Sequence, residues 1–132
     1  MRLAQIAVGR HKDGPDRVLC QRYRERPATL GRGLGLAGPE IVELPESRGR
    51  RPDERKRDEA AAITARLSPG LVIALDERGR SQASDAFAAR IAEARDAGTA
   101  SASFVIGGAD GLADEIRDAA GLTLAFGALT IP

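Results

Sequence analysis

The residues best placed to bind a small molecule lie at three predicted strand ends. These ends are Leu75-Asp76, Ile106-Gly107-Gly108 and the segment from Phe126 to Pro132. Glycines allow backbone amides and carbonyls to approach a flat ring closely, and the aliphatic and aromatic residues supply apolar walls for a pocket. The same residues also fit a structural role, in which the glycines form turns and the apolar side chains fill the core.

Side chains for nucleophilic or metal chemistry are scarce. His11 is the single histidine and Cys20 the single cysteine, and no histidine is placed to activate the thiol. The sequence contains no nucleophile elbow, no phosphate-binding P-loop and no zinc-ligand spacing. The stretch Gly31-Arg-Gly-Leu-Gly resembles part of a dinucleotide fingerprint, but it does not follow a predicted strand. We therefore assign no catalytic residue and no metal ligand.

Alternating strands and helices are predicted to position the three strand ends. Strands are expected over 2–8, 40–44, 71–75, 104–106 and 122–125. Helices are expected from Pro15 to an end or kink at Pro27, then over 53–67, 84–97 and 112–120, with Asp53 and Ser84 as caps. Residues 28–38 are expected to form a loose turn or loop, 46–52 a mobile basic loop, and 76–80 a loop. This alternation predicts an α/β fold with a mostly parallel five-stranded sheet, which binds ligands at the carboxyl ends of its strands.

Size and composition predict one globular domain. The 132 residues, of which 42% are hydrophobic and 30% charged, suffice for one core. The net charge of +1 conceals an asymmetry, because 14 basic residues face 10 acidic ones up to Glu59 and 6 face 9 after it. One interpretation is a first half that faces phosphates, and the other is arginine scattered over a solvated surface.

Neither a secretion signal nor a membrane span is predicted. Gln5 and the polar run over 9–13 interrupt the apolar start of the chain. No run reaches the roughly 18 apolar residues that a membrane span requires. With one cysteine, no disulfide can form within the chain. We therefore expect a cytoplasmic protein that is not embedded in a membrane.

Several segments together resemble the ribosomal large subunit methyltransferase H family, and the similarity runs from end to end. They are the opening Met-Arg-Leu-Ala-Gln-Ile-Ala-Val-Gly, Val42-Glu-Leu-Pro-Glu-Ser-Arg-Gly-Arg-Arg, Ala74-Leu-Asp-Glu-Arg-Gly, Phe104-Val-Ile-Gly-Gly-Ala-Asp-Gly-Leu and the terminal Leu-Thr-Ile-Pro. Within them, Ile-Gly-Gly-Ala-Asp-Gly is the most specific motif. The resemblance implies a SPOUT fold, with helices on both faces of the sheet, a deep trefoil knot and a homodimeric assembly.

The resemblance also implies a reaction and a site. The reaction is transfer of the methyl group of S-adenosylmethionine to N3 of a pseudouridine in 23S rRNA, on the assembled ribosome and without a metal. The family's cofactor contacts would fall on Leu75, Gly107, Phe126, Gly127, Ala128, Leu129, Thr130 and Ile131. Arg48, Arg50, Arg51, Arg55 and Lys56 would contact rRNA phosphates, or else form a solvated charged surface.

The sequence departs from the family after Pro132. Family members continue there with a histidine, a long amphipathic helix and a His-Pro-Tyr-His segment, none of which this sequence contains. We therefore expect a single SPOUT domain over 1–132 that lacks the knot helix, and no catalytic side chain can be carried over. One alternative is a truncated, catalytically incompetent module that binds the ribosome or a partner, and another is an unrelated flavodoxin-like nucleotide binder.

Overall fold

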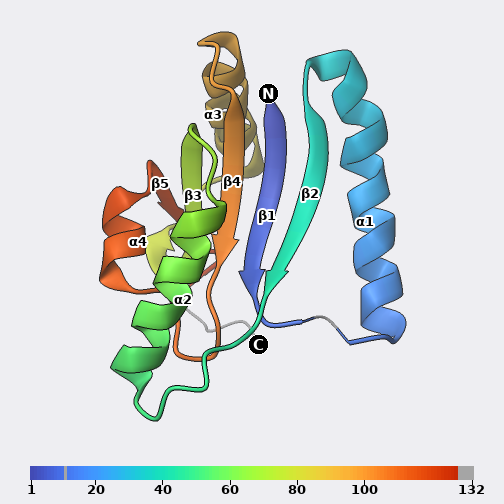
Figure 1. The fold of residues 1–132 in the computed structure, drawn as a ribbon. Helices are drawn as coiled ribbons and strands as arrows, with labels where there is room; N and C mark the ends of the chain where they lie inside the picture. Colours follow the sequence, from blue (N-terminus) through green and yellow to red (C-terminus); the bar gives the residue numbers. More distant parts are fainter. Residues whose placement is uncertain (11, 128–132) are drawn as a thin grey trace.

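Five parallel strands form one sheet in the computed structural model, which describes residues 1–10 and 12–127 (Figure 1). The strands are β1 (Arg2–Val8), β2 (Ala37–Leu44), β3 (Leu71–Arg80), β4 (Ser101–Ile106) and β5 (Leu122–Leu124). Their order in the sheet is β2-β1-β4-β3-β5, and every neighbouring pair is parallel. The predicted α/β fold with a parallel sheet is confirmed. Because all strands run the same way, their carboxyl ends meet at one edge.

Helices cover both faces of this sheet, as predicted. On one face α2 (Pro52–Arg66) and α4 (Asp114–Ala119) pack on a core that includes Ile6, Ile63 and Val105. On the other face α3 (Ser84–Asp96) packs on a second core around Ile73 and Ala102. Figure 1 shows α2 and α4 in front of the strands and α3 behind them. Strands β3 and β4 are therefore covered on both sides, which explains the continuous apolar run over 71–75 in β3.

Helix α1 (Pro15–Gly31) lies beside the edge strand β2 and passes through Pro27 (Figure 1). Of the two outcomes predicted at Pro27, an end or a kink, the structure contradicts the end, because the helix continues to Gly31. Proline removes one intrahelical hydrogen bond, but nearly every α1 residue is exposed, so water can satisfy the carbonyl that loses its partner. The side chains of Leu19, Tyr23 and Leu30 are 51%, 59% and 70% exposed. Their spacing places them on one helix face, which forms an apolar stripe open to solvent.

The residues between α1 and β2 are more ordered than predicted. A short 3-10 helix, η1 (Arg32–Leu34), follows α1, and β2 begins at Ala37 rather than at residue 40. Pro39 is tolerated inside β2 because an edge strand needs no donor on its outer side. The pairing of β1 with β2 shifts by one residue between Arg2 and Ala4, where the Gly38-Pro39 segment is accommodated.

Other boundaries differ from the sequence predictions as well. Strand β4 begins at Ser101 rather than at residue 104, and α4 covers Asp114–Ala119 rather than 112–120. Strand β3 continues to Arg80, because Arg80 pairs with Leu124 of β5 beyond a bulge. The N-caps of α2 and α3 are Arg51 and Ala83, so Asp53 and Ser84 lie inside their helices. Pro52 explains the first of these, since proline has the fixed φ that suits the first helical position. Within the described residues, no helix is both long and apolar enough to cross a membrane.

Candidate functional site

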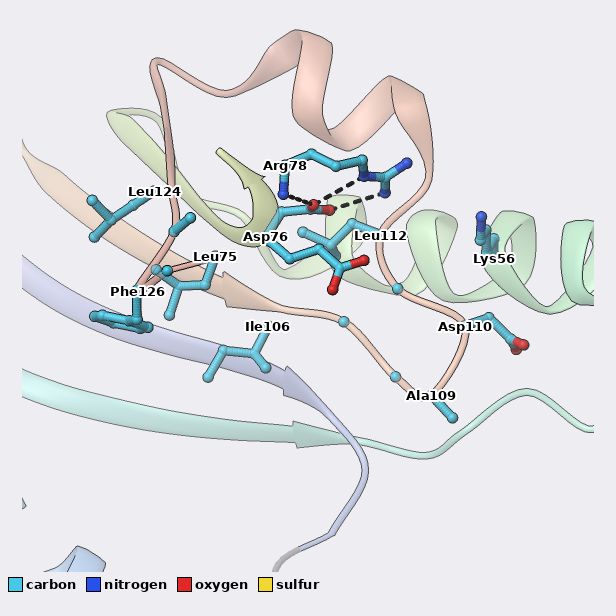
Figure 2. A pocket seen from close by; sticks show the side chains of 16 residues that line it. Lys56, Leu75, Asp76, Arg78, Ile106, Ala109, Asp110, Leu112, Leu124 and Phe126 are labelled. Atoms are coloured by element: carbon cyan, nitrogen blue, oxygen red, sulfur yellow. Dashed lines mark hydrogen bonds and ion pairs between the residues drawn. The ribbon is translucent and has the colours of Figure 1, made fainter. Parts of the chain in front are cut away.

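A pocket of about 660 Å³ opens beside residues 75–78 of β3 and the ends of β4 and β5 (Figure 2). Its volume falls in the range of small-molecule sites. Four of the predicted site residues line it, namely Leu75, Gly107, Phe126 and Gly127. The other four, Ala128, Leu129, Thr130 and Ile131, lie outside the described residues. The structure therefore brings together every predicted site residue that it describes.

One wall of this pocket is apolar. In the sheet Leu75 lies opposite Ile106 of β4 and opposite Leu124 of β5, so strand register alone brings these side chains together. Figure 2 shows Phe126 beside Leu75 and Ile106. The Phe126 side chain is 71% exposed, which leaves an aromatic surface free for a ligand. This wall suits a flat ring with little polar surface.

The opposite wall is the glycine loop, which we define as Gly107–Gly111. Its turn is closed by a hydrogen bond from the Gly111 amide to the Gly108 carbonyl, at 3.0 Å, and Gly111 has a φ of +84°. A Cβ atom added to Gly107 would lie 2.8 Å from the carbonyl carbon of Gly111. No larger residue fits at Gly107 unless the loop moves. The wall consequently offers backbone groups to a ligand rather than side chains.

A buried carboxylate also lines the pocket, that of Asp76, which the sequence placed at a candidate strand end without a role for its side chain. The Asp76 side chain is 5% exposed and accepts hydrogen bonds from Arg78 at 3.0 Å (Nε), 3.1 Å (Nη2) and 2.9 Å (backbone N). Arg117 approaches the same carboxylate, at 3.7 Å. Burial tends to raise the pKa of Asp76, but the hydrogen bonds from Arg78 and the charges of both arginines outweigh it, so the pKa is lowered. The signal in the sequence was an aspartate directly after a buried strand.

The basic residues predicted to contact phosphates divide into three groups. Arg48, Arg50 and Arg51 lie in the segment over 46–51, which we call the arginine loop, and their side chains are exposed. Lys56 is half-buried and lines the pocket from α2. Arg55 instead forms an ion pair with Asp110 in the glycine loop, so it is not a free phosphate ligand. Among the described residues, no group of three or more His, Cys, Asp or Glu could hold a metal ion.

The paired Asp76 predicts a loss of stability in acid. Because its pKa is lowered in the folded state, its contribution is complete above the ordinary value of 3.8 and disappears as the pH falls through the lowered value. In chemical denaturation, Asp76→Asn should lower the free energy of unfolding by about 2 kcal/mol at neutral pH and by much less in acid. The exposed Asp118→Asn is the control. An equal effect of Asp76→Asn at both pH values would contradict this assignment.

Comparison with known proteins agrees with the resemblance seen in the sequence. The sequence model of a family described as predicted SPOUT methyltransferase matches residues 1–132. The ribosomal RNA large subunit methyltransferase H of Bradyrhizobium sp. (strain BTAi1 / ATCC BAA-1182) is 54% identical over 134 residues, which cover 100% of this chain and 83% of that protein. The proteins of the same name from Rhodopseudomonas palustris (strain BisB18) and Bradyrhizobium sp. (strain ORS 278) are 52% and 51% identical, with 83% and 82% of their lengths covered and all of this chain. The chain belongs to the ribosomal RNA large subunit methyltransferase H family of SPOUT methyltransferases.

Proposed function

We propose that this protein transfers the methyl group of S-adenosylmethionine to N3 of a pseudouridine in 23S rRNA, on the assembled ribosome in the cytoplasm. Membership of an rRNA methyltransferase family supports the reaction class. The observation that carries the proposal is the pocket at the strand ends, which joins an apolar wall to a tight glycine loop. Parallel α/β sheets bind their ligands at this edge.

The residues of the pocket fit S-adenosylmethionine. Leu75, Ile106, Leu124 and Phe126 would exclude water from the adenine ring, and the backbone of the glycine loop would approach it closely. The proposed contacts continue through Gly127 to Ala128, Leu129, Thr130 and Ile131. The cofactor supplies an activated methyl group on a sulfonium. The chain must then align the acceptor nitrogen and favour loss of its proton. We assign no side chain to that proton transfer.

The arginine loop is the proposed contact with rRNA. Arg48, Arg50 and Arg51 are exposed and lie in the connection between β2 and α2. Lys56 lies one turn into α2 and places a further positive charge at the edge of the pocket. Arginine and lysine contacts with phosphates position a nucleic acid without reading its sequence. The loop would thus hold the rRNA while the pocket holds the methyl donor.

We also propose that residues 1–132 form one SPOUT domain that assembles as a homodimer. One sheet with a core on each face supports the single domain. The apolar stripe of α1, formed by Leu19, Tyr23 and Leu30, supports the dimer, because contiguous exposed apolar surface is typical of interaction sites.

Calorimetric titration tests the cofactor site. S-Adenosylmethionine should bind saturably to the chain, and Gly107→Ala should weaken binding at least about tenfold, or about 1.4 kcal/mol, because the new Cβ displaces the glycine loop. Gly33→Ala is the matched control, since its Cβ would meet nothing within 4 Å. Absence of binding by the folded chain would refute the cofactor assignment and favour a module that docks on the ribosome without transferring methyl groups.

Salt dependence tests the arginine loop. The slope of the logarithm of ribosome affinity against the logarithm of salt concentration should fall by about 1 for each phosphate contact removed. Arg48→Ala/Arg50→Ala should therefore reduce this slope by about 2. The control is Arg22→Ala/Arg24→Ala on α1, which removes the same charge from exposed positions. If both pairs of substitutions changed the slope equally, general charge rather than the loop would govern binding.

Analytical ultracentrifugation tests the dimer. The unmodified chain should sediment as a dimer, and Leu19→Glu should raise the dissociation constant at least about tenfold, because burying an unpaired charge in the interface is costly. Gln21→Glu adds the same charge to another face of α1 and should leave the dimer intact. A monomer at all concentrations, or equal effects of both substitutions, would refute this interface.

A further inference from the structure

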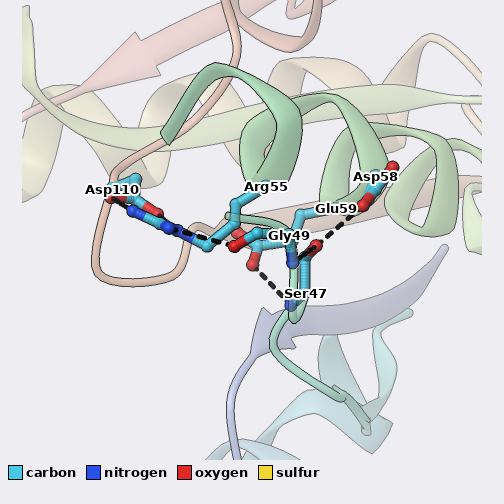
Figure 3. Close-up of polar contacts among 6 residues, drawn as sticks. All are labelled: Ser47, Gly49, Arg55, Asp58, Glu59 and Asp110. Carbon is cyan, nitrogen blue, oxygen red and sulfur yellow. Dashed lines mark hydrogen bonds and ion pairs between the residues drawn. The ribbon is translucent and has the colours of Figure 1, made fainter. Parts of the chain in front are cut away.

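Arg55 joins two loops that are distant in the sequence (Figure 3). Its Nε and Nη2 atoms donate hydrogen bonds to the two carboxylate oxygens of Asp110, at 2.6 Å and 3.0 Å. Its Nη1 atom donates a third hydrogen bond to the carbonyl of Gly49, at 3.1 Å. Asp110 belongs to the glycine loop and Gly49 to the arginine loop. One guanidinium therefore holds the proposed cofactor wall and the proposed rRNA contact at the same time.

The chemistry of this bridge is specific to arginine. A guanidinium can make two parallel bonds to a carboxylate and still point another N–H elsewhere, whereas an ammonium is a compact point charge. The hydrogen bond with Arg55 lowers the pKa of Asp110 and raises that of Arg55, so the pair stays charged at neutral pH. The two side chains are 28% and 20% exposed. A lysine at position 55 could keep either the bond to Asp110 or the bond to Gly49 but would lose the other.

A second residue of α2, Glu59, is hydrogen-bonded to the arginine loop and lies against the glycine loop. Glu59 lies one turn after Arg55, is 6% exposed, and accepts a hydrogen bond from the Ser47 amide at 2.9 Å. Its other carboxylate oxygen, Oε1, lies close to Gly108, because a Cβ atom added to that glycine would be only 2.9 Å from it. The Ser47 hydroxyl in turn donates to Asp58 at 2.7 Å and accepts from the Gly49 amide at 3.1 Å. The arginine loop, predicted to be mobile, is thus fastened to α2 at both Ser47 and Gly49.

We propose that Arg55 is a positioning residue that makes the arginine loop and the glycine loop one mechanical unit, so that phosphates bound to the first change the pocket's affinity for the methyl donor. This coupling rests on the proposed function. A displacement of Gly49 strains the bonds that Arg55 makes to Asp110, and a displacement of Asp110 strains the bond to Gly49. By linkage, each ligand then alters the affinity for the other by the same factor.

Hydrogen exchange without any ligand tests whether the loops form one unit. In Asp110→Ala, amides of 46–51 should exchange at least about threefold faster, although the substitution is in the other loop, because Arg55 loses its anchor. Arg55→Lys should speed exchange in both loops, and the exposed Arg57→Lys on the same helix should change neither. The double variant Arg55→Asp/Asp110→Arg re-forms an ion pair and should slow exchange again in the glycine loop.

Two results would overturn the proposal. One is normal exchange over 46–51 in folded Asp110→Ala, and the other is faster exchange across all elements, which would show a merely structural role. Titration of S-adenosylmethionine with and without polyuridylate, a phosphate-chain probe, completes the test. The unmodified chain should show at least about a twofold change in affinity that Arg55→Lys abolishes, and an equal change in both proteins would contradict coupling through Arg55. A chain that bound no S-adenosylmethionine would refute the proposed cofactor and the coupling to it. The hydrogen-exchange result would still show whether the arginine loop and the glycine loop form one mechanical unit.

Discussion

The site depends on the parallel pairing of β3 with β4 on one side and with β5 on the other. This pairing places Leu75 opposite both Ile106 and Leu124. It also fixes where the residues that follow these positions leave the sheet. Parallel strands need crossover connections, and here α3 and α4 provide them on opposite faces of the sheet. A slip of one residue would turn each apolar side chain to the wrong face. Burial of the core side chains therefore maintains the strand register, and the register positions the residues that line the pocket.

At the carboxyl edge of the sheet, backbone segments approach one another closely. An added Cβ at Gly79 would lie 2.6 Å from the Thr123 carbonyl oxygen, and one at Gly107 would lie 2.8 Å from Gly111. Chain segments this close leave no room for side chains between them, so at these glycines the pocket offers amides and carbonyls to a ligand. Such a site offers few catalytic side chains, which agrees with the proposed reaction, whose methyl donor would already be activated. The chain's main contribution would be alignment.

The sequence predicted what depends on local pattern and missed what depends on distant side-chain pairing. Apolar runs predicted all five strands, although β2, β3 and β4 are longer than predicted, and the glycines after residue 106 predicted the loop that forms the pocket wall. The extension of β3 to Arg80 was missed because it depends on pairing with Leu124, across 44 positions of sequence. The bond between Arg55 and Asp110, 55 residues apart, was missed for the same reason. A charged residue on a helix gives no local signal of the loop that it will meet.

Charge pairing explains how the pocket can hold the buried carboxylate of Asp76 and the half-buried Asp110. Asp76 is paired with Arg78 and Arg117, and Asp110 is paired with Arg55. Lys56 also lines the pocket, and its charge contributes to the lowered pKa of Asp110 without a direct ion pair among the described residues. Asp76 and Asp110 are thus neutralised by arginines, the exposed Glu77 adds a negative charge, and Lys56 contributes a positive charge on the side of α2. The arginine loop that precedes α2 extends this positive surface, so the field of the protein would guide a polyanion toward the pocket.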